Sequence, residues 1–171
     1  RCVDNLLNTL QPLSNSISRI VNQHYEHYYT KLSKLIWDPF IPRSFGIFLM
    51  IALNFNVISN YHWNNNDDSN GLCFVIALGD FEGGELCFSQ LEIIVELKPG
   101  QVVTFPFKLL LHANLLITRG IRFSIVSYVS KGFFLKNTKD TEITNTNNHQ
   151  DFFNAKNLNL KLTSLRKPKS L

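Results

Sequence analysis

The feature that most constrains the fold is a succession of short apolar runs, each bounded by turn-forming residues, in the middle of the chain. The runs are rich in Ile, Val, Leu and Phe and cover residues 47–57, 72–79, 91–97, 101–107, 109–116 and 122–129. Strands that recur about every ten residues between turn signals are typical of antiparallel sandwiches, and not of alternating strands and helices. The sequence therefore predicts a mainly β domain over residues 44–130, a sandwich or jelly roll.

The residues before this domain have a helical periodicity. The residues of one face recur at steps of three and four, at Leu10, Leu13, Ile17, Ile20, Val21, His24, Tyr28, Leu32 and Leu35. This pattern predicts an amphipathic helix from about residue 14 to 36, capped by Ser14 or Ser16 and ended by Asp38–Pro39. We expect residues 1–43 to form a helical support region that packs on the sheet, with Trp37 in the core.

The positive charge is concentrated after the predicted strands. Residues 46–130 carry four basic and seven acidic residues, whereas residues 131–171 carry eight basic and three acidic residues. The C-terminal stretch is rich in Asn, Thr, Asp and Lys, so we expect residues 131–171 to be a polar, basic and disordered tail. Such a tail can bind nucleic acid through phosphate contacts, and the alternative is a solvated end without a partner.

The cysteines and the hydropathy bound the cellular environment. Cys2, Cys73 and Cys87 are too few and too scattered for a disulfide framework. Cys73 and Cys87 lie within apolar runs, which predicts buried free thiols and suits a reducing compartment. No apolar run approaches the roughly 18 residues of a membrane-spanning helix, and no signal-peptide pattern is found. We therefore expect an intracellular protein, nuclear or cytoplasmic, without a membrane partner.

Two histidines about fifty residues apart along the chain indicate a metal site. Non-haem iron(II) oxygenases hold iron with two histidines and one carboxylate on one face of an octahedron. In a jelly roll, a histidine and an acid two residues later leave one strand on the same side, because side chains alternate with period two. His62 fits the first histidine and His112 the second, while the position of the acid is occupied by Asn64.

Arg122 fits the role of an anchor for the co-substrate. We expect His112 on one strand and Arg122 on its hairpin partner, across the loop from Asn114 to Gly120. A guanidinium there can form a bidentate pair with the distal carboxylate of 2-oxoglutarate. Ser124, two residues further on, faces the same side and can add a hydroxyl; the alternative is that Arg122 is an ordinary surface arginine.

The order of these motifs resembles the Tet/J-binding-protein oxygenase domain family of 2-oxoglutarate/Fe(II)-dependent dioxygenases, with the strongest likeness to its expanded fungal branch. The segments that carry the resemblance are residues 54–56, 62, 71–86, 97–100 and 120–124. The resemblance implies a double-stranded β-helix (jelly roll), the cofactors Fe(II) and 2-oxoglutarate, and oxidation of a methyl group of thymine or 5-methylcytosine in nucleic acid. It places His62 and His112 as metal ligands and Arg122 as the co-substrate arginine.

Asn64 departs from the family pattern, which has aspartate at this position. An amide oxygen can coordinate a metal, but it lacks the negative charge that a carboxylate brings to a divalent cation. Asp67 and Asp68 can substitute if the loop shifts, although their spacing from His62 does not fit the usual strand geometry. The alternative is that Asn64 begins a polar turn and Asp67–Asp68 forms its solvated end.

Three functions are compatible with these observations. The first is a dioxygenase that hydroxylates a C–H bond, such as one in a nucleobase methyl group. A base in a duplex would have to be flipped out to reach the site. The second is a catalytically degenerate jelly roll that serves as a binding or scaffold module. The third is a cupin-like metal protein without oxygenase activity, which the position of Arg122 disfavours.

Overall fold

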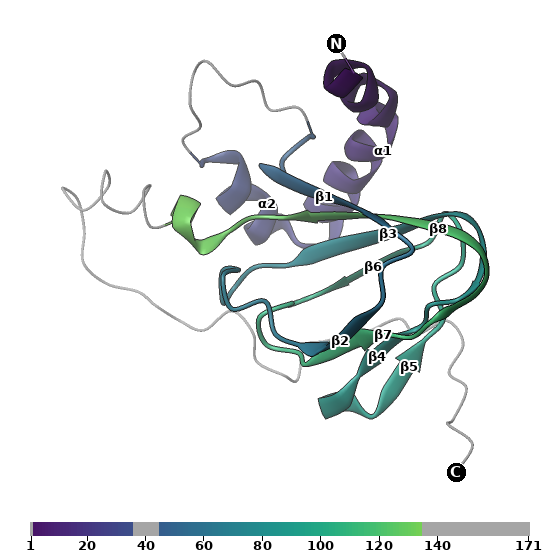
Figure 1. Ribbon diagram of the computed structural model, residues 1–171. Helices are drawn as coiled ribbons and strands as arrows, with labels where there is room; N and C mark the ends of the chain where they lie inside the picture. The colour runs from purple at the N-terminus through teal and green to yellow at the C-terminus, as the bar shows by residue number, and fades with distance from the viewer. Residues whose placement is uncertain (1, 36–44, 135–171) are drawn as a thin grey trace.

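Two four-stranded antiparallel sheets face each other in the computed structural model, which describes residues 2–35 and 45–134 of the chain (Figure 1). The first sheet has the order β1-β8-β3-β6 and the second β2-β7-β4-β5. The strands are β1 (Met50–Phe55), β2 (Ser59–His62), β3 (Cys73–Gly83), β4 (Leu86–Phe88), β5 (Ile93–Val95), β6 (Val102–Phe105), β7 (His112–Asn114) and β8 (Ile117–Tyr128). This arrangement confirms the predicted double-stranded β-helix with a flanking helix.

The continuous apolar run in β3 is explained by burial of both faces of its sheet. Cys73, Val75 and Ala77 belong to a cluster between the two sheets. Their neighbours Phe74 and Ile76 belong to a second cluster that includes residues of the N-terminal helices. Because successive side chains of a strand point to opposite faces, a strand between two cores needs apolar residues at every position.

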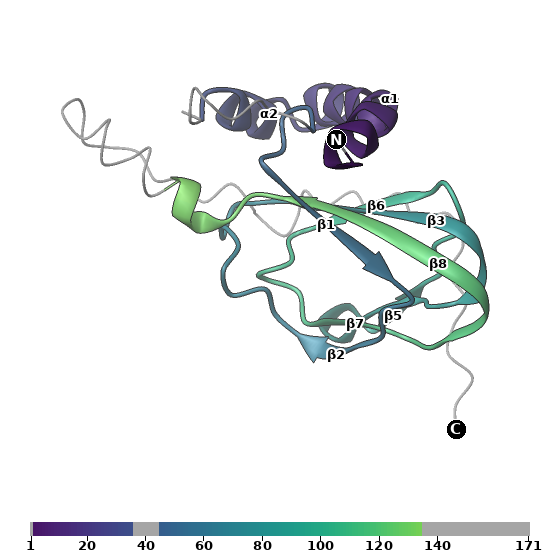
Figure 2. The same cartoon turned by 45° about the horizontal axis from the view of Figure 1, so that its top comes forward.

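Two helices cover the outer face of the first sheet (Figure 2). They are α1 (Cys2–His24) and α2 (Glu26–Ser33), separated at Tyr25, whose φ of −139° is not helical. The predicted single helix over residues 14–36 was therefore wrong in its start and its continuity. Ser14 does not cap a helix; it lies buried inside α1, where its hydroxyl donates to the carbonyl of Gln11 at 3.0 Å. The helix also accommodates Pro12, which the sequence reasoning did not consider.

Several predicted strand boundaries were also wrong, most importantly near His112. The run 109–116 is mostly not a strand: Leu109 and Leu110 donate to the carbonyl of Pro106 in a turn, and β7 spans only three residues. β7 pairs with β2 and β4, whereas β8 pairs with β1 and β3. The predicted hairpin between the strands of His112 and Arg122 is therefore absent from the described residues, and the chain crosses between sheets instead.

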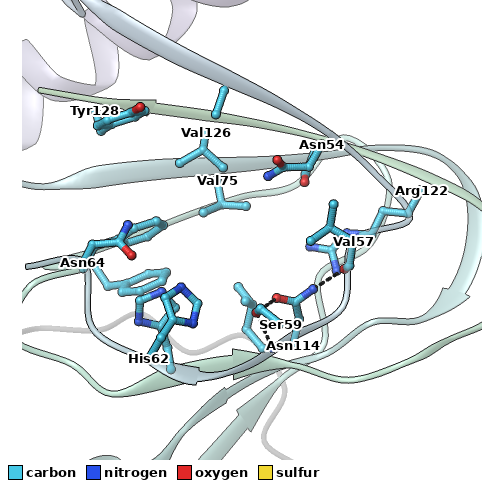
Figure 3. A pocket seen from close by; sticks show the side chains of 16 residues that line it. Asn54, Val57, Ser59, His62, Asn64, Val75, Asn114, Arg122, Val126 and Tyr128 are labelled. Carbon is cyan, nitrogen blue, oxygen red and sulfur yellow. Dashed lines mark hydrogen bonds between the residues drawn. The ribbon is translucent and has the colours of Figure 1, made fainter. Parts of the chain in front are cut away.

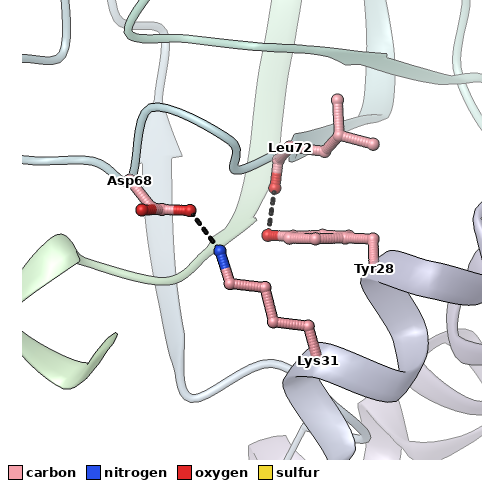
Figure 4. A network of polar contacts seen from close by, with 4 residues as sticks. All are labelled: Tyr28, Lys31, Asp68 and Leu72. Carbon is pink, nitrogen blue, oxygen red and sulfur yellow. Dashed lines mark hydrogen bonds and ion pairs between the residues drawn. The ribbon is translucent and has the colours of Figure 1, made fainter. Parts of the chain in front are cut away.

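A polar contact fixes α2 to the segment that precedes β3 (Figure 4). The buried hydroxyl of Tyr28 donates to the carbonyl of Leu72 at 3.1 Å, and burial raises its pKa. Lys31 forms an ion pair of 2.7 Å with Asp68, on the same segment. The helical region thus contacts the connection between Asn64 and β3.

We expect Tyr28→Phe to lower the free energy of unfolding by about 1 kcal/mol, because the buried carbonyl of Leu72 loses its donor. Urea denaturation of both proteins measures this difference. Tyr25→Phe is the matched control, since Tyr25 is 37% exposed and its hydroxyl can remain hydrated. Equal effects of the two substitutions would contradict a stabilising role for the Tyr28 contact.

Other predictions concern single residues and the chain ends. Cys73 and Cys87 are buried free thiols, as expected. No helix within residues 2–35 or 45–134 has the length and apolar character needed to cross a membrane. Residues 131–134 form a helical turn whose two phenylalanines pack against the helix–sheet core. Trp37 and the remainder of the predicted tail, residues 135–171, lie outside the described residues.

Candidate functional site

His62 and His112 lie side by side on neighbouring strands of the second sheet. His62 ends β2 and His112 begins β7, and the two residues are partners in the antiparallel register. Their ring centroids are 4.4 Å apart. The Nδ1 atoms of His62 and His112 lie 2.8 Å from the carbonyl oxygens of Asn60 and Leu110 respectively. In the tautomer that donates from Nδ1, each ring keeps the lone pair of Nε2 for a metal.

The apolar surroundings of His112 favour its neutral form. The ring packs against Phe105 and Phe107, with centroid distances of 5.0 and 4.7 Å. Burial lowers the pKa of His112; the contact with the Leu110 carbonyl opposes this shift, and neighbouring His62 adds to it. A neutral imidazole is the form that binds a metal.

This pKa shift gives a pH dependence of stability. Because the folded pKa of His112 lies below the ordinary value, the unfolded chain binds more protons as the pH falls through the histidine range. We therefore expect the free energy of unfolding of the metal-free protein to fall between about pH 7.5 and 5.5. Urea denaturation across this range measures the slope, and His112→Gln should reduce it. His24→Gln, at the exposed end of α1, should leave it unchanged.

Asn64 lies two residues after His62, next to the imidazole pair (Figure 3). Its backbone N–H donates to the carbonyl of Phe107 at 3.3 Å. This hydrogen bond holds the segment after β2 against the segment that follows β6, a strand of the first sheet. Its side-chain Nδ2 lies 3.5 Å from Oδ2 of Asp67. Figure 3 shows the amide oxygen on the side of the imidazoles.

Asp67 is buried, contrary to the alternative in which Asp67–Asp68 forms a solvated end. Asp67 is 6% exposed, and its carboxylate also accepts a hydrogen bond of 3.3 Å from the thiol of Cys73. Burial raises the pKa of Asp67, and the hydrogen bonds from Cys73 and Asn64 oppose this shift. Asp68 does not form a solvated end either, because its carboxylate forms an ion pair with Lys31. Sequence reasoning missed the burial of Asp67 because it lies in a run of polar residues.

Arg122 is brought to the same cavity from β8. It is 4% exposed, and one terminal nitrogen donates to the carbonyl of Gly84. Gly84 has φ +70°, and a Cβ there would come within 2.7 Å of that nitrogen, so glycine is required for this approach. The Nε of Arg122 is buried and has no partner in the described residues. Burial lowers the pKa of Arg122, which Glu85 opposes.

Asn56 positions the backbone of Arg122 and was missed by the sequence reasoning. Its side-chain oxygen accepts from the backbone N–H of Arg122 at 2.7 Å, and its own N–H donates to the carbonyl of Arg122 at 2.9 Å. Asn56 has φ +44°, a conformation that asparagine adopts more readily than most residues. Asn56 lies inside the predicted strand 47–57, where asparagine is uncommon, and this was the available signal; the observed β1 ends one residue before it.

All five predicted site residues line one cavity of about 300 Å³ between the sheets. Figure 3 shows His62 and Asn64 at one end and Arg122 at the other. Ser124 lines it from β8, as the period of two predicts. None of the lining residues carries a carboxylate, and Arg122 is the only lysine or arginine among them. A ligand that contacts both ends must bridge the cavity and carry negative charge near Arg122.

The donors at the imidazole end fit a divalent transition metal incompletely. Two imidazole nitrogens and an amide oxygen are available, but no group of three His, Cys, Asp or Glu side chains that could hold a metal occurs within the described residues. Asp67 is therefore not placed as a third ligand beside His62 and His112. The donor set suits iron(II) in type, since imidazole and oxygen ligands are accepted, but lacks the carboxylate charge.

The fold defines this chain as a double-stranded β-helix protein with a two-histidine cavity. Among solved structures it is similar to "NgTET1 in complex with 5mC DNA", the TET1 protein of Naegleria, with a TM-score of 0.65 and 21% identity. The match covers 79% of this chain and 57% of the NgTET1 chain. No family model and no curated protein matches the sequence. The likeness shows a Tet-like fold, and this chain spans little more than half of the structure that it matches.

Proposed function

We propose that this chain is a 2-oxoglutarate/Fe(II)-dependent dioxygenase-like domain of the Tet/J-binding-protein type. The observation that carries the proposal is that Arg122, which is buried and has no hydrogen-bond partner for its Nε, lines the cavity that also holds the His62–His112 pair. Glu85 acts on this guanidinium electrostatically but forms no ion pair with it in the described residues. A desolvated guanidinium without a directly paired carboxylate is costly, and an anionic ligand would compensate it. The likeness to the NgTET1 fold supports the same reading.

Each residue has a distinct role in this proposal. His62 and His112 hold iron(II) through Nε2, and the amide oxygen of Asn64 is the third protein ligand. Arg122 binds the distal carboxylate of 2-oxoglutarate, and the hydroxyl of Ser124 supports it. Bound iron would supply oxygen activation, coupled to oxidative decarboxylation of 2-oxoglutarate to succinate. The apolar walls around His112 exclude water from this end of the cavity.

The substrate class that we propose is a nucleobase methyl group. NgTET1 was solved with 5mC DNA, and the eight basic residues of 131–171 offer phosphate contacts. A base in duplex DNA would have to be flipped out to reach the cavity. Assignment to the expanded fungal branch is supported by the sequence resemblance alone, which is carried by residues 54–56, 62, 71–86, 97–100 and 120–124.

A second candidate function is a degenerate binding module that keeps the fold and binds ligands without turnover. Asn64 favours this alternative, because the aspartate of the family pattern is replaced by a neutral side chain. The two functions differ in a single measurable property, the conversion of 2-oxoglutarate to succinate. Both predict a cavity that accepts an anion beside Arg122.

Anaerobic titration with iron(II), followed by assay of succinate release with 2-oxoglutarate and oxygen, tests the proposal. We expect iron binding in the wild type and its loss in His112→Ala. His24→Ala, which removes an exposed imidazole on α1, is the control. Binding without succinate release would select the degenerate module. Identical iron binding by the wild type and His112→Ala would contradict the assignment of His112 as a metal ligand.

A further inference from the structure

Asp67 has an unusual environment for a carboxylate. It is 6% exposed, and both groups that donate to it, the amide of Asn64 and the thiol of Cys73, are uncharged. No ion pair involves Asp67 within residues 2–35 and 45–134, although Asp68, the next residue, pairs with Lys31. Lys108 acts on Asp67 electrostatically without forming an ion pair with it. A buried carboxylate without a directly paired cation is costly, so the fold holds an unpaired negative charge close to the cavity.

The turn between Asn64 and Asp67 aims this charge at the amide. The N–H of Asp67 donates to the carbonyl of Asn64 at 3.0 Å, which closes the turn and returns the carboxylate to the side chain of Asn64. The turn is fixed on its other side, because Lys131 and Ser130 both donate to the carbonyl of Asn66, at 3.0 and 3.2 Å. The orientation of Asp67 is thus built into the backbone.

The contact also selects the orientation of the Asn64 amide. Its Nδ2 is the donor to Asp67, so Oδ1, on the other branch of the planar group, is directed toward the imidazoles (Figure 3). A carboxylate that accepts from the N–H₂ side of an amide increases the negative character of the amide oxygen. The imidazole end of the cavity then offers a metal two imidazole nitrogens and a polarised amide oxygen, and the carboxylate of Asp67 lies behind that amide.

We propose that Asp67 is a positioning residue that supplies, through Asn64, the negative charge that position 64 itself lacks. The inference rests on the proposed metal-binding function and extends it to the outer partners of the site. In the family pattern the negative charge lies on the metal ligand itself. In this arrangement it lies on Asp67, which contacts the ligand Asn64 from behind. Outer partners of metal ligands commonly change metal affinity by about 10–100-fold.

Titration of Co²⁺, in place of oxygen-sensitive iron, into four proteins tests the inference. Asp67→Asn keeps the size and the acceptor oxygen but removes the charge, and we expect Co²⁺ affinity to fall about tenfold. Asp68→Asn, which removes an equal charge that pairs with Lys31, should change it by less than about twofold. In the exchanged variant Asn64→Asp/Asp67→Asn, the carboxylate is returned to the ligand position, and Co²⁺ should bind at least as tightly as in the wild type.

A purely structural role for Asp67 predicts a different pattern. If the carboxylate only stabilised the turn, Asp67→Asn would lower the melting temperature of the metal-free protein. A charge held in place for the metal predicts instead that the metal-free melting temperature does not fall while Co²⁺ affinity does. Should Asp67→Asn fail to fold, comparison of the exchanged variant with Asn64→Asp still decides, because loss of the Asp67 charge should weaken Co²⁺ binding in that background too, and equal affinities of these two proteins would overturn the inference.

The failure of this inference and that of the proposed function have different signatures. Equal Co²⁺ affinities of the wild type and Asp67→Asn would overturn the role of Asp67 and leave the histidine site intact. Co²⁺ binding only by proteins that carry Asn64→Asp would also overturn it, since Asp67 would then not supply the missing charge. Absence of binding in all four proteins would remove the proposed metal site itself.

Discussion

Arg122→Ala is expected to weaken 2-oxoglutarate binding by roughly a hundredfold, or about 3 kcal/mol, in isothermal titration of the Co²⁺-loaded protein. The guanidinium is 4% exposed and its Nε lacks a partner, so a dicarboxylate would gain a charge-assisted contact in a site with little water. Arg122→Lys should recover only part of the affinity. Lysine keeps the charge but not the planar fork that binds a carboxylate with two hydrogen bonds.

Arg119→Ala is the matched control for this experiment. Arg119 lies on the same strand, β8, but is exposed and forms an ion pair of 2.9 Å with Glu82. Its removal lowers the net charge by the same amount without touching the cavity, so 2-oxoglutarate affinity should change by less than about twofold. Equal losses in both alanine variants would point to a general electrostatic effect. Full affinity in Arg122→Ala would remove Arg122 from the anchor role.

The parts of the site that the sequence predicted are those with a short-range signature. His62 and Asn64 are two residues apart, and Arg122 and Ser124 repeat this spacing. Arg122 and Ser124 lie on one side of β8, whereas β2 ends at His62 and Asn64 follows it. Their convergence on one cavity agrees with the double-stranded β-helix. Their roles toward metal and co-substrate stay predictions.

The parts that the sequence reasoning missed depend on contacts between distant segments. Asp67 reads as loop because its neighbours are polar, and its burial depends on residues 130–131 closing over the turn. The clamp of Asn56 on Arg122 joins residues 66 positions apart. Helical periodicity likewise could not show that the helical stretch breaks at Tyr25, because the apolar pattern continues across the break.

Asn64→Asp is expected to raise Co²⁺ affinity by about 10–100-fold, because a carboxylate oxygen carries the charge that the amide lacks. The same substitution should lower the melting temperature of the metal-free protein, since a second carboxylate would face Asp67 across the present 3.5 Å contact. Added Co²⁺ should reverse the loss by occupying the position between the negative charges and the imidazoles. Differential scanning calorimetry with and without Co²⁺ measures both effects.

Asn65→Asp is the control, because it adds the same charge one residue away at an exposed position that does not line the cavity. If Asn64→Asp binds Co²⁺ no more tightly than Asn65→Asp, the side chain at position 64 does not face the metal. Succinate release then separates the two proposed functions. Turnover by the wild type and the variant at similar rates shows that an amide ligand backed by Asp67 is sufficient. Turnover by the variant alone shows that substitution of one ligand converted an oxygenase fold into a binding module, since every other predicted site residue still lines the cavity.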